Sequence, residues 1–96
     1  MATYQILCWQ EIPSAVEARD AGGLKKLQLS QKFMALIDQA AMERDLTGSD
    51  AYLEQWNKSP RQEREGSAAD VAAAVAKEIE DDFMNIRSKA LKPKNA

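Results

Sequence analysis

The residues best suited to do chemistry are two arginines in a polar stretch beside a tryptophan. Arg61 and Arg64 follow Trp56 by a few residues, and a helix is expected to begin shortly after them at Ser67. Guanidinium groups and the free N–H groups of a helix N-terminus both attract negative charge, so together they are able to hold an anion or an acidic partner. Glutamates alternate with these arginines, and an ordinary solvated loop remains the other interpretation.

The two tryptophans of the chain are the second candidate feature. Trp9 ends an apolar run, where core or core-edge packing is the main expectation, although exposed tryptophans often anchor partners. Trp56 is expected to lie with Tyr52 and Leu53 on one side of a short helix. The candidate residues for binding a partner or an anion are therefore Trp56, Arg61, Arg64, Tyr52 and Trp9.

Catalysis and metal binding find little support in the remaining residue types. The chain has no histidine and a single cysteine, Cys8, which is expected to be a small buried hydrophobic residue rather than a reactive thiol. Acidic residues cluster at positions 78–82, but neighbours on a helix point in different directions, which favours a solvated face over an ion site. Gly22 and Gly23 lack the spacing of a phosphate-binding loop. We expect a non-enzymatic protein with no cofactor and no metal.

The composition of the chain limits which classes of partner and which cellular locations are expected. The formal net charge is −2, which argues against sequence-independent nucleic-acid binding, since that requires a net basic face. No stretch approaches the length of a membrane span, and the first residues lack the pattern of a signal peptide. A single cysteine leaves no intrachain disulfide. A cytoplasmic protein that binds neither membrane nor nucleic acid is expected.

The candidate residues must be positioned by secondary structure, and the first third of the chain is expected to form strands. Residues 3–9 predict a central strand with large apolar residues on both faces, which Pro13 should end. Alternating residues at 14–19 and 24–30, separated by a turn with two glycines, predict a β-hairpin. Helical spacing then predicts a helix from the N-cap Ser30 to about Arg44, stopping near Thr47 and Gly48.

Helices are also expected in the second half of the chain. A short helix should run from a cap at Ser49 to about Trp56, and residues 57–66 should form a polar surface loop. Ser67 should cap a last helix with a continuous apolar stripe that reaches Ile86, and residues 92–96 should form a flexible tail. The expected fold is α+β: one domain over residues 1–91, with a small antiparallel sheet of about three N-terminal strands packed against two longer helices and one short helix.

The same segments carry a resemblance to a known family. They resemble the small bacterial "virulence factor" domains, whose members occur alone or within a larger conserved virulence factor, and the resemblance covers roughly residues 3–90. It implies a bacterial cytoplasmic protein without an assigned activity and brings no catalytic residues. The segments are YQILCW at 4–9, IPS at 12–14, LSQKF at 29–33, Ile37-Asp38, Ala41-Met42, and SDAYL at 49–53 with Trp56.

Two functions remain open. The first is a non-enzymatic protein-interaction or accessory module with a protein partner, because catalytic residue types are missing while a complete core and aromatic–arginine surfaces are present. The alternative is a small subunit of an enzyme complex, or a binder of an anionic small molecule through the loop with Arg61 and Arg64. Self-association through the alanine-rich side of the last helix is also left open.

Overall fold

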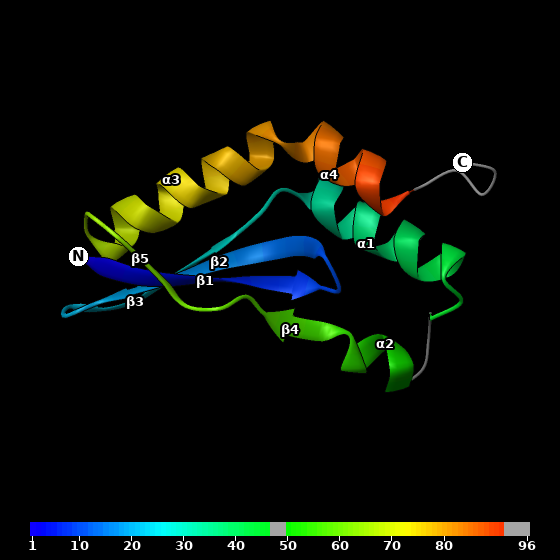
Figure 1. Ribbon diagram of the computed structural model, residues 1–96, viewed down its shortest axis with the longest axis horizontal. Coiled ribbons are helices and arrows are strands. Elements are labelled where there is room, and N and C mark those ends of the chain that lie inside the picture. The colour runs from blue at the N-terminus through cyan, green and yellow to red at the C-terminus, as the bar shows by residue number, and fades with distance from the viewer. Residues whose placement is uncertain (47–49, 92–96) are drawn as a thin grey trace.

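Three successive antiparallel strands form the first part of the computed structural model, which describes residues 1–46 and 50–91. They are β1 (Ala2–Trp9), β2 (Ile12–Asp20) and β3 (Gly23–Gln28). The predicted hairpin is confirmed: Asp20 pairs with Gly23 across a two-residue loop, and Gly23 has a φ of 137°, a conformation that favours glycine. Figure 1 shows β1 and β2 running through the middle of the molecule.

The prediction that Pro13 ends the first strand is wrong. The chain turns instead at Gln10, whose φ of 52° gives the sharp reversal, and β2 already begins at Ile12. Pro13 lies inside β2 opposite Cys8, where the register shifts by one residue. Proline is tolerated there because a bulge removes the need for its missing N–H.

The predicted polar loop over residues 57–66 is wrong, because two short strands lie within it. β4 (Trp56–Lys58) pairs with the end of β1, and β5 (Gln62–Arg64) pairs with its beginning. Between them, the Ser59 N–H donates to the Ile6 carbonyl at 2.9 Å, and the Ser59 hydroxyl accepts from the Ile6 N–H at 2.8 Å. The sheet therefore has five strands rather than about three, with β1 in the centre.

The first long helix is confirmed, and the last one is divided. α1 (Gln31–Glu43) begins after Ser30, although the Ser30 hydroxyl donates to Glu80 instead of capping the helix. α3 (Ala68–Asp81) is capped by Ser67 as expected, through the Asp70 N–H at 3.2 Å. The predicted continuous helix breaks at Asp82, and α4 (Phe83–Ala90) follows in a new direction (Figure 1).

The short helix also ends earlier than predicted. α2 (Asp50–Glu54) stops before Trp56, which is instead the first residue of β4. The predicted stop at Thr47 and Gly48, the predicted cap at Ser49 and the predicted tail at 92–96 lie outside the described residues. Within the described part of the chain, no helix is long and apolar enough to cross a membrane.

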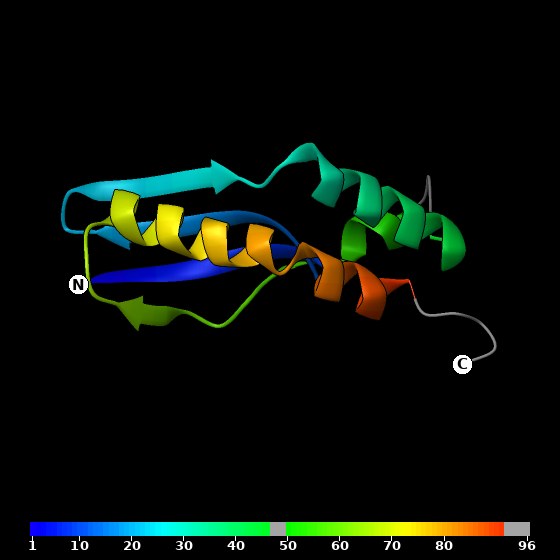
Figure 2. The same cartoon turned by 90° about the horizontal axis from the view of Figure 1, so that it is seen from above.

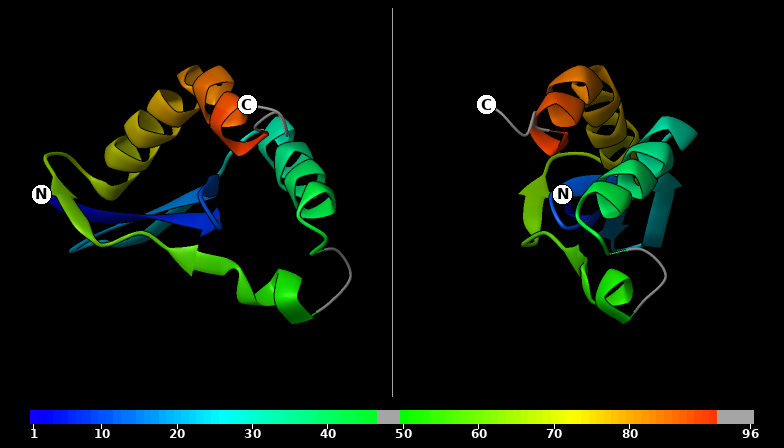
Figure 3. Two further views of the ribbon diagram at one scale, coloured as in Figure 1. Left: turned by 45° about the vertical axis from the view of Figure 1, so that its right-hand side comes forward. Right: turned by 90° about the vertical axis from the view of Figure 1, so that its right-hand side faces the viewer.

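Two hydrophobic clusters explain why the helices lie where they do. The α3 cluster joins the start of the sheet to α3 through Val16, Ala18, Val71 and their neighbours. The Trp9 cluster joins the end of β1 to α1 through Trp9, Ile37 and their neighbours. α3 covers the strands, while α1 and α4 lie near and beyond their ends (Figure 2). The fold is α+β, with α2 on the other side of the sheet end from α1 (Figure 3).

Candidate functional site

One face of the sheet carries no helix over most of β1, β2 and β3, within the described residues (Figure 1). We call it the open face. Side chains alternate along a strand, so those opposite the α3 cluster belong to it. The register sets them in rows across the three strands. One row is Thr3, Arg19 and Leu24, and the next is Gln5, Glu17 and Lys26.

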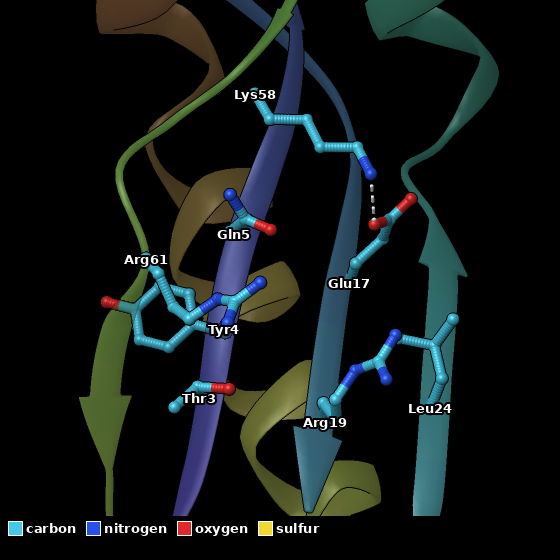
Figure 4. Close-up of a pocket in the computed structure, with 8 residues that line it drawn as sticks. All are labelled: Thr3, Tyr4, Gln5, Glu17, Arg19, Leu24, Lys58 and Arg61. Atoms are coloured by element: carbon cyan, nitrogen blue, oxygen red, sulfur yellow. Dashed lines mark ion pairs between the residues drawn. The ribbon is translucent and has the colours of Figure 1, made fainter.

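A small polar cavity lies on the open face, with a volume of about 100 Å³. Figure 4 looks onto it with α3 behind the strands. The Arg61 side chain reaches over β1, and the Arg19 side chain extends from β2 toward Leu24 on β3 (Figure 4). The lining residues are Thr3, Tyr4, Gln5, Glu17, Arg19, Leu24, Lys58 and Arg61.

Positive charge exceeds negative charge around this cavity. Lys58 is neutralised by Glu17, with 3.0 Å between Nζ and Oε1. Within the described part of the chain, Arg19 and Arg61 have no hydrogen-bonded or ion-paired partner, and both are exposed. Glu63 is the register partner of Thr3 and shares this face. The open face therefore carries Arg19, Lys26, Lys58 and Arg61 against Glu17 and Glu63, and it is basic in a chain whose net charge is −2. Guanidinium groups in such a setting bind carboxylates or other oxyanions with two parallel hydrogen bonds.

Arg64 does not join Arg61, although the sequence analysis grouped them. Arg64 pairs in register with Ala2, on the face that α3 covers, and there it meets Glu78 of α3. The distance from Arg64 Nη2 to Glu78 Oε2 is 2.6 Å. This hydrogen bond raises the pKa of Arg64 and lowers the pKa of Glu78. Arg64 is therefore engaged within the molecule, and only Arg61 faces the open face.

The N-terminus of α3 already holds a carboxylate of the same chain. Asp20 Oδ2 accepts from the Ala68 N–H at 2.7 Å, and Asp20 Oδ1 accepts from the Gly22 N–H at 2.7 Å. The first of these bonds, followed by the second, lowers the pKa of Asp20. The carboxylate of Asp20, at the β2–β3 turn, therefore occupies the anion site that was predicted at this helix end.

The three candidate aromatic residues lie together at the far end of β1. Trp9 is 0% exposed, and its indole N–H donates to the Tyr52 carbonyl at 2.9 Å. The Tyr52 ring lies 5.5 Å from the Trp9 ring and 6.3 Å from the Trp56 ring, measured between centroids. Trp9 and Trp56 are also direct register partners. This stack fixes α2 and β4 to the sheet, so Trp9 has no surface left for a partner.

Trp56 borders the open face. It is half-buried and lies two residues before Lys58 on β4, so both side chains are on the same side of the strand. Arg61 follows in the connection to β5 and lines the cavity with Lys58. Of the predicted site residues, the structure places Trp56 and Arg61 on this side of the sheet. Trp9 lies in the core and Arg64 on the helix side.

Comparison with known proteins identifies the family. The family model described as "Virulence factor" matches residues 7–91, nearly the whole chain. The chain belongs to this family. The resemblance noted from the sequence is confirmed, and Arg19, Lys58 and Arg61 all lie inside the matched span. No curated protein and no solved structure matches the chain.

In this virulence-factor family member, the open-face residues that the sequence did not single out include Arg19, Glu17 and Lys58. Arg19 and Glu17 alternate with Val16 and Ala18 in the predicted hairpin, which already assigned them to the polar face of a strand. Their proximity to Arg61 was hidden, because it requires residues 56–64 to pair with β1. Alternating charges in a predicted hairpin are thus the available signal for this face.

The open face contains few groups able to perform covalent chemistry, and Cys8 is not among the residues that line its cavity. Burial, then the nearby charge of Glu11, raises the pKa of Cys8, which keeps its thiol protonated. In the described ranges 1–46 and 50–91, no three histidine, cysteine or acidic side chains are grouped as metal ligands. Arginine, lysine, amide and hydroxyl groups bind oxyanions well, and binding is the chemistry that the open face supports best.

Proposed function

We propose that this chain is a non-enzymatic accessory module of a bacterial cytoplasmic system that binds an acidic protein partner on the open face of its sheet. The observation that carries the proposal is the pair of unneutralised guanidinium groups, Arg19 and Arg61, beside one cavity in an acidic chain. Arginine is enriched at binding hot spots because its planar fork matches a carboxylate.

The surroundings of the cavity support a protein partner. Leu24 is 54% exposed next to Arg19, and half-buried Trp56 lies beside Lys58 at the covered end of the face. Apolar and aromatic side chains bordering arginines give a surface on which part of the contact excludes water, which strengthens the charged contacts. Opposite charge on the partner would also accelerate the encounter.

A matched pair of charge variants tests this proposal. A partner would first be captured from the native cell with the wild-type protein and then purified. For Arg19→Ala/Arg61→Ala, we expect the dissociation constant to rise at least about tenfold and its salt dependence to weaken. The control, Arg64→Ala/Lys77→Ala, removes the same charge from residues that pair with Glu78 and Asp81. Equal losses in both variants, or no loss in the first, would contradict the proposal.

A second candidate function is binding of a small anion in the cavity, whether alone or as a small subunit of an enzyme complex. Arg19, Lys58 and Arg61 all line one cavity of about 100 Å³, and that volume suits one carboxylate or phosphate group. Thermal unfolding with millimolar inorganic phosphate, citrate or succinate measures it. A bound anion raises the Tm of the wild-type protein and leaves Arg61→Ala unchanged. No rise with any of them excludes this candidate.

A further inference from the structure

The outer edge of β3 is the longest unpaired strand edge among the described residues. β3 pairs with β2 on one side, and the sheet order places it at the end of the sheet. Its residues are exposed except for half-buried Leu27. An exposed edge offers a row of N–H and C=O groups to any extended chain that reaches it.

The register shows which backbone groups are free to pair. The β2–β3 hairpin closes on Asp20 and Gly23, and at its other end the Leu29 N–H donates to the Ser14 carbonyl at 3.0 Å. In an antiparallel ladder, directly bonded pairs alternate with unbonded ones. Lys25 and Leu27 therefore direct their backbone groups toward β2. The groups that point outward belong to Leu24, Lys26 and Gln28.

The same three residues place their side chains on the open face. Leu24 is the register partner of Arg19, and Lys26 is the partner of Glu17. A strand added beyond β3 would extend both rows, so its side chains on this face would lie next to Leu24 and Lys26. Cross-strand neighbours of opposite charge stabilise a sheet, and a carboxylate beside Lys26 satisfies that rule.

We propose that the partner contributes an extended acidic segment that adds to β3 as a further strand, an inference that rests on the proposed function of the open face. Glutamate or aspartate would alternate with apolar residues along the segment, the carboxylates facing Lys26 and the neighbouring Arg19. Backbone hydrogen bonds to Leu24, Lys26 and Gln28 supply affinity, and the charged row supplies selectivity.

A second copy of this chain fits the edge poorly. When two β3 strands pair antiparallel through their outward residues, in the register centred on Lys26, Leu24 of each copy lies opposite Gln28 of the other. Lys26 would then lie directly opposite Lys26, and like charges in that position destabilise a sheet. Lysines on an edge strand discourage self-pairing for this reason, and they leave the edge open to an acidic chain.

Amide hydrogen exchange followed by NMR tests the inference on the wild-type protein. The probe is a capped peptide of about six residues, the usual strand length, that alternates glutamate with valine, and its control replaces glutamate by lysine. When the acidic peptide saturates the protein, we expect exchange to slow about tenfold or more at Leu24, Lys26 and Gln28. Lys25 and Leu27 should change little, because β2 already holds their amides. The lysine peptide should have no effect.

Two substitutions of one residue separate strand addition from charge attraction. Lys26→Ala removes the charge and keeps the outward N–H, whereas Lys26→Pro removes both and leaves the bonds to β2 in place. We expect Lys26→Pro to weaken binding of the peptide about tenfold more than Lys26→Ala does. Circular dichroism checks the fold of both. If Lys26→Pro does not fold, the exchange pattern of the wild-type protein decides alone.

Several outcomes would overturn the inference. They are no binding of the acidic peptide at millimolar concentration, equal binding of the lysine peptide, binding without slowed exchange at the three outward amides, and assembly of the protein into β3-paired dimers. The proposed function has a separate readout, since Arg19→Ala/Arg61→Ala is measured with the whole partner. Loss of binding in that variant together with a failed exchange test would keep the open face as the binding surface and exclude strand addition.

Discussion

Arg61 and Arg64 are close in the sequence, but strand pairing places their side chains on opposite faces of the sheet. Their three-residue separation suits a shared site in a loop, which is how the sequence analysis interpreted it. Residues an odd number of positions apart on extended chain point to opposite faces. Pairing of β5 with β1 therefore directs Arg64 toward Glu78 of α3, while Arg61 lies over the open face. Arg19, far away in the sequence, lines the same cavity as Arg61.

The two tryptophans have different roles, which their stability effects should reveal. Trp9→Phe removes the indole N–H bond to Tyr52 and leaves a gap in a fully buried site, so we expect a loss of about 2 kcal/mol in the free energy of unfolding. Trp56→Phe affects a half-buried ring and should lose less than about 1 kcal/mol. Urea denaturation measures both. A larger loss for Trp56→Phe than for Trp9→Phe would show that this assignment is reversed.

At the scale of elements, the sequence predicted what strong periodicity determines. The hairpin of β2 and β3 and the helix α1 have long alternating or helical patterns, and all three were found. β4 and β5 were missed because three-residue polar edge strands carry no apolar period, and their pairing with β1 depends on distant residues. The break at Asp82 was missed because the apolar spacing of Phe83 and Ile86 continues that of α3 across it.

The open face was only partly predictable for the same reason. Trp56 and Arg61 were chosen from their types, and the structure places both on this side of the sheet. Arg19, Glu17 and Lys58 became relevant only once three strands were aligned. Local sequence thus points to residue types that can bind an anion, whereas the sheet register decides which of them lie on the same face.

The contact between the β2–β3 turn and α3 should make stability depend on acid pH. The pKa of Asp20 is lowered from its ordinary value of 3.8, so its stabilising effect is fully present above that value. The effect is lost as the pH falls through the lowered pKa of the folded state. We expect Asp20→Asn to have a lower Tm than the wild type at pH 7, and the difference to shrink toward pH 2. Thermal melts across this range measure it.

The control for Asp20 is Asp81, a carboxylate on the surface of α3, the helix that Asp20 contacts. Asp81 pairs with Lys77 one turn away, and both side chains are largely exposed. Exposed pairs of this kind contribute little, so Asp81→Asn should melt close to the wild type at pH 7. A gap between Asp20→Asn and the wild type that stays constant from pH 7 to pH 2 would show that the carboxylate charge is not what joins the turn to α3.

At the scale of the molecule, the charged residues are divided between the two faces of the sheet, whereas the hydrophobic core is divided along the length of the strands. Within the residues that the structure describes, the open face carries the unpaired arginines Arg19 and Arg61, whereas on the helix side the carboxylates of Glu78, Glu80 and Asp81 are paired with Arg64, Lys32 and Lys77. The hydrophobic core is instead divided along the strands, into the α3 cluster and the Trp9 cluster. Phe83 and Ile86 pack against both clusters. The start of α4 therefore connects the two halves of the core.

This connection predicts that the whole molecule unfolds in one transition. Phe83 packs edge-to-face on Phe33 at 5.0 Å, so Phe83→Ala should lower the free energy of unfolding by about 2 kcal/mol. The neighbouring Met84 is 67% exposed, and Met84→Ala should cost less than about 0.5 kcal/mol. Both tryptophans report on the Trp9 cluster, while far-ultraviolet circular dichroism reports on every element. The two signals should shift together in Phe83→Ala, because Phe83 belongs to both halves. A shift in tryptophan fluorescence alone would mean that the α3 cluster is stable without the Trp9 cluster.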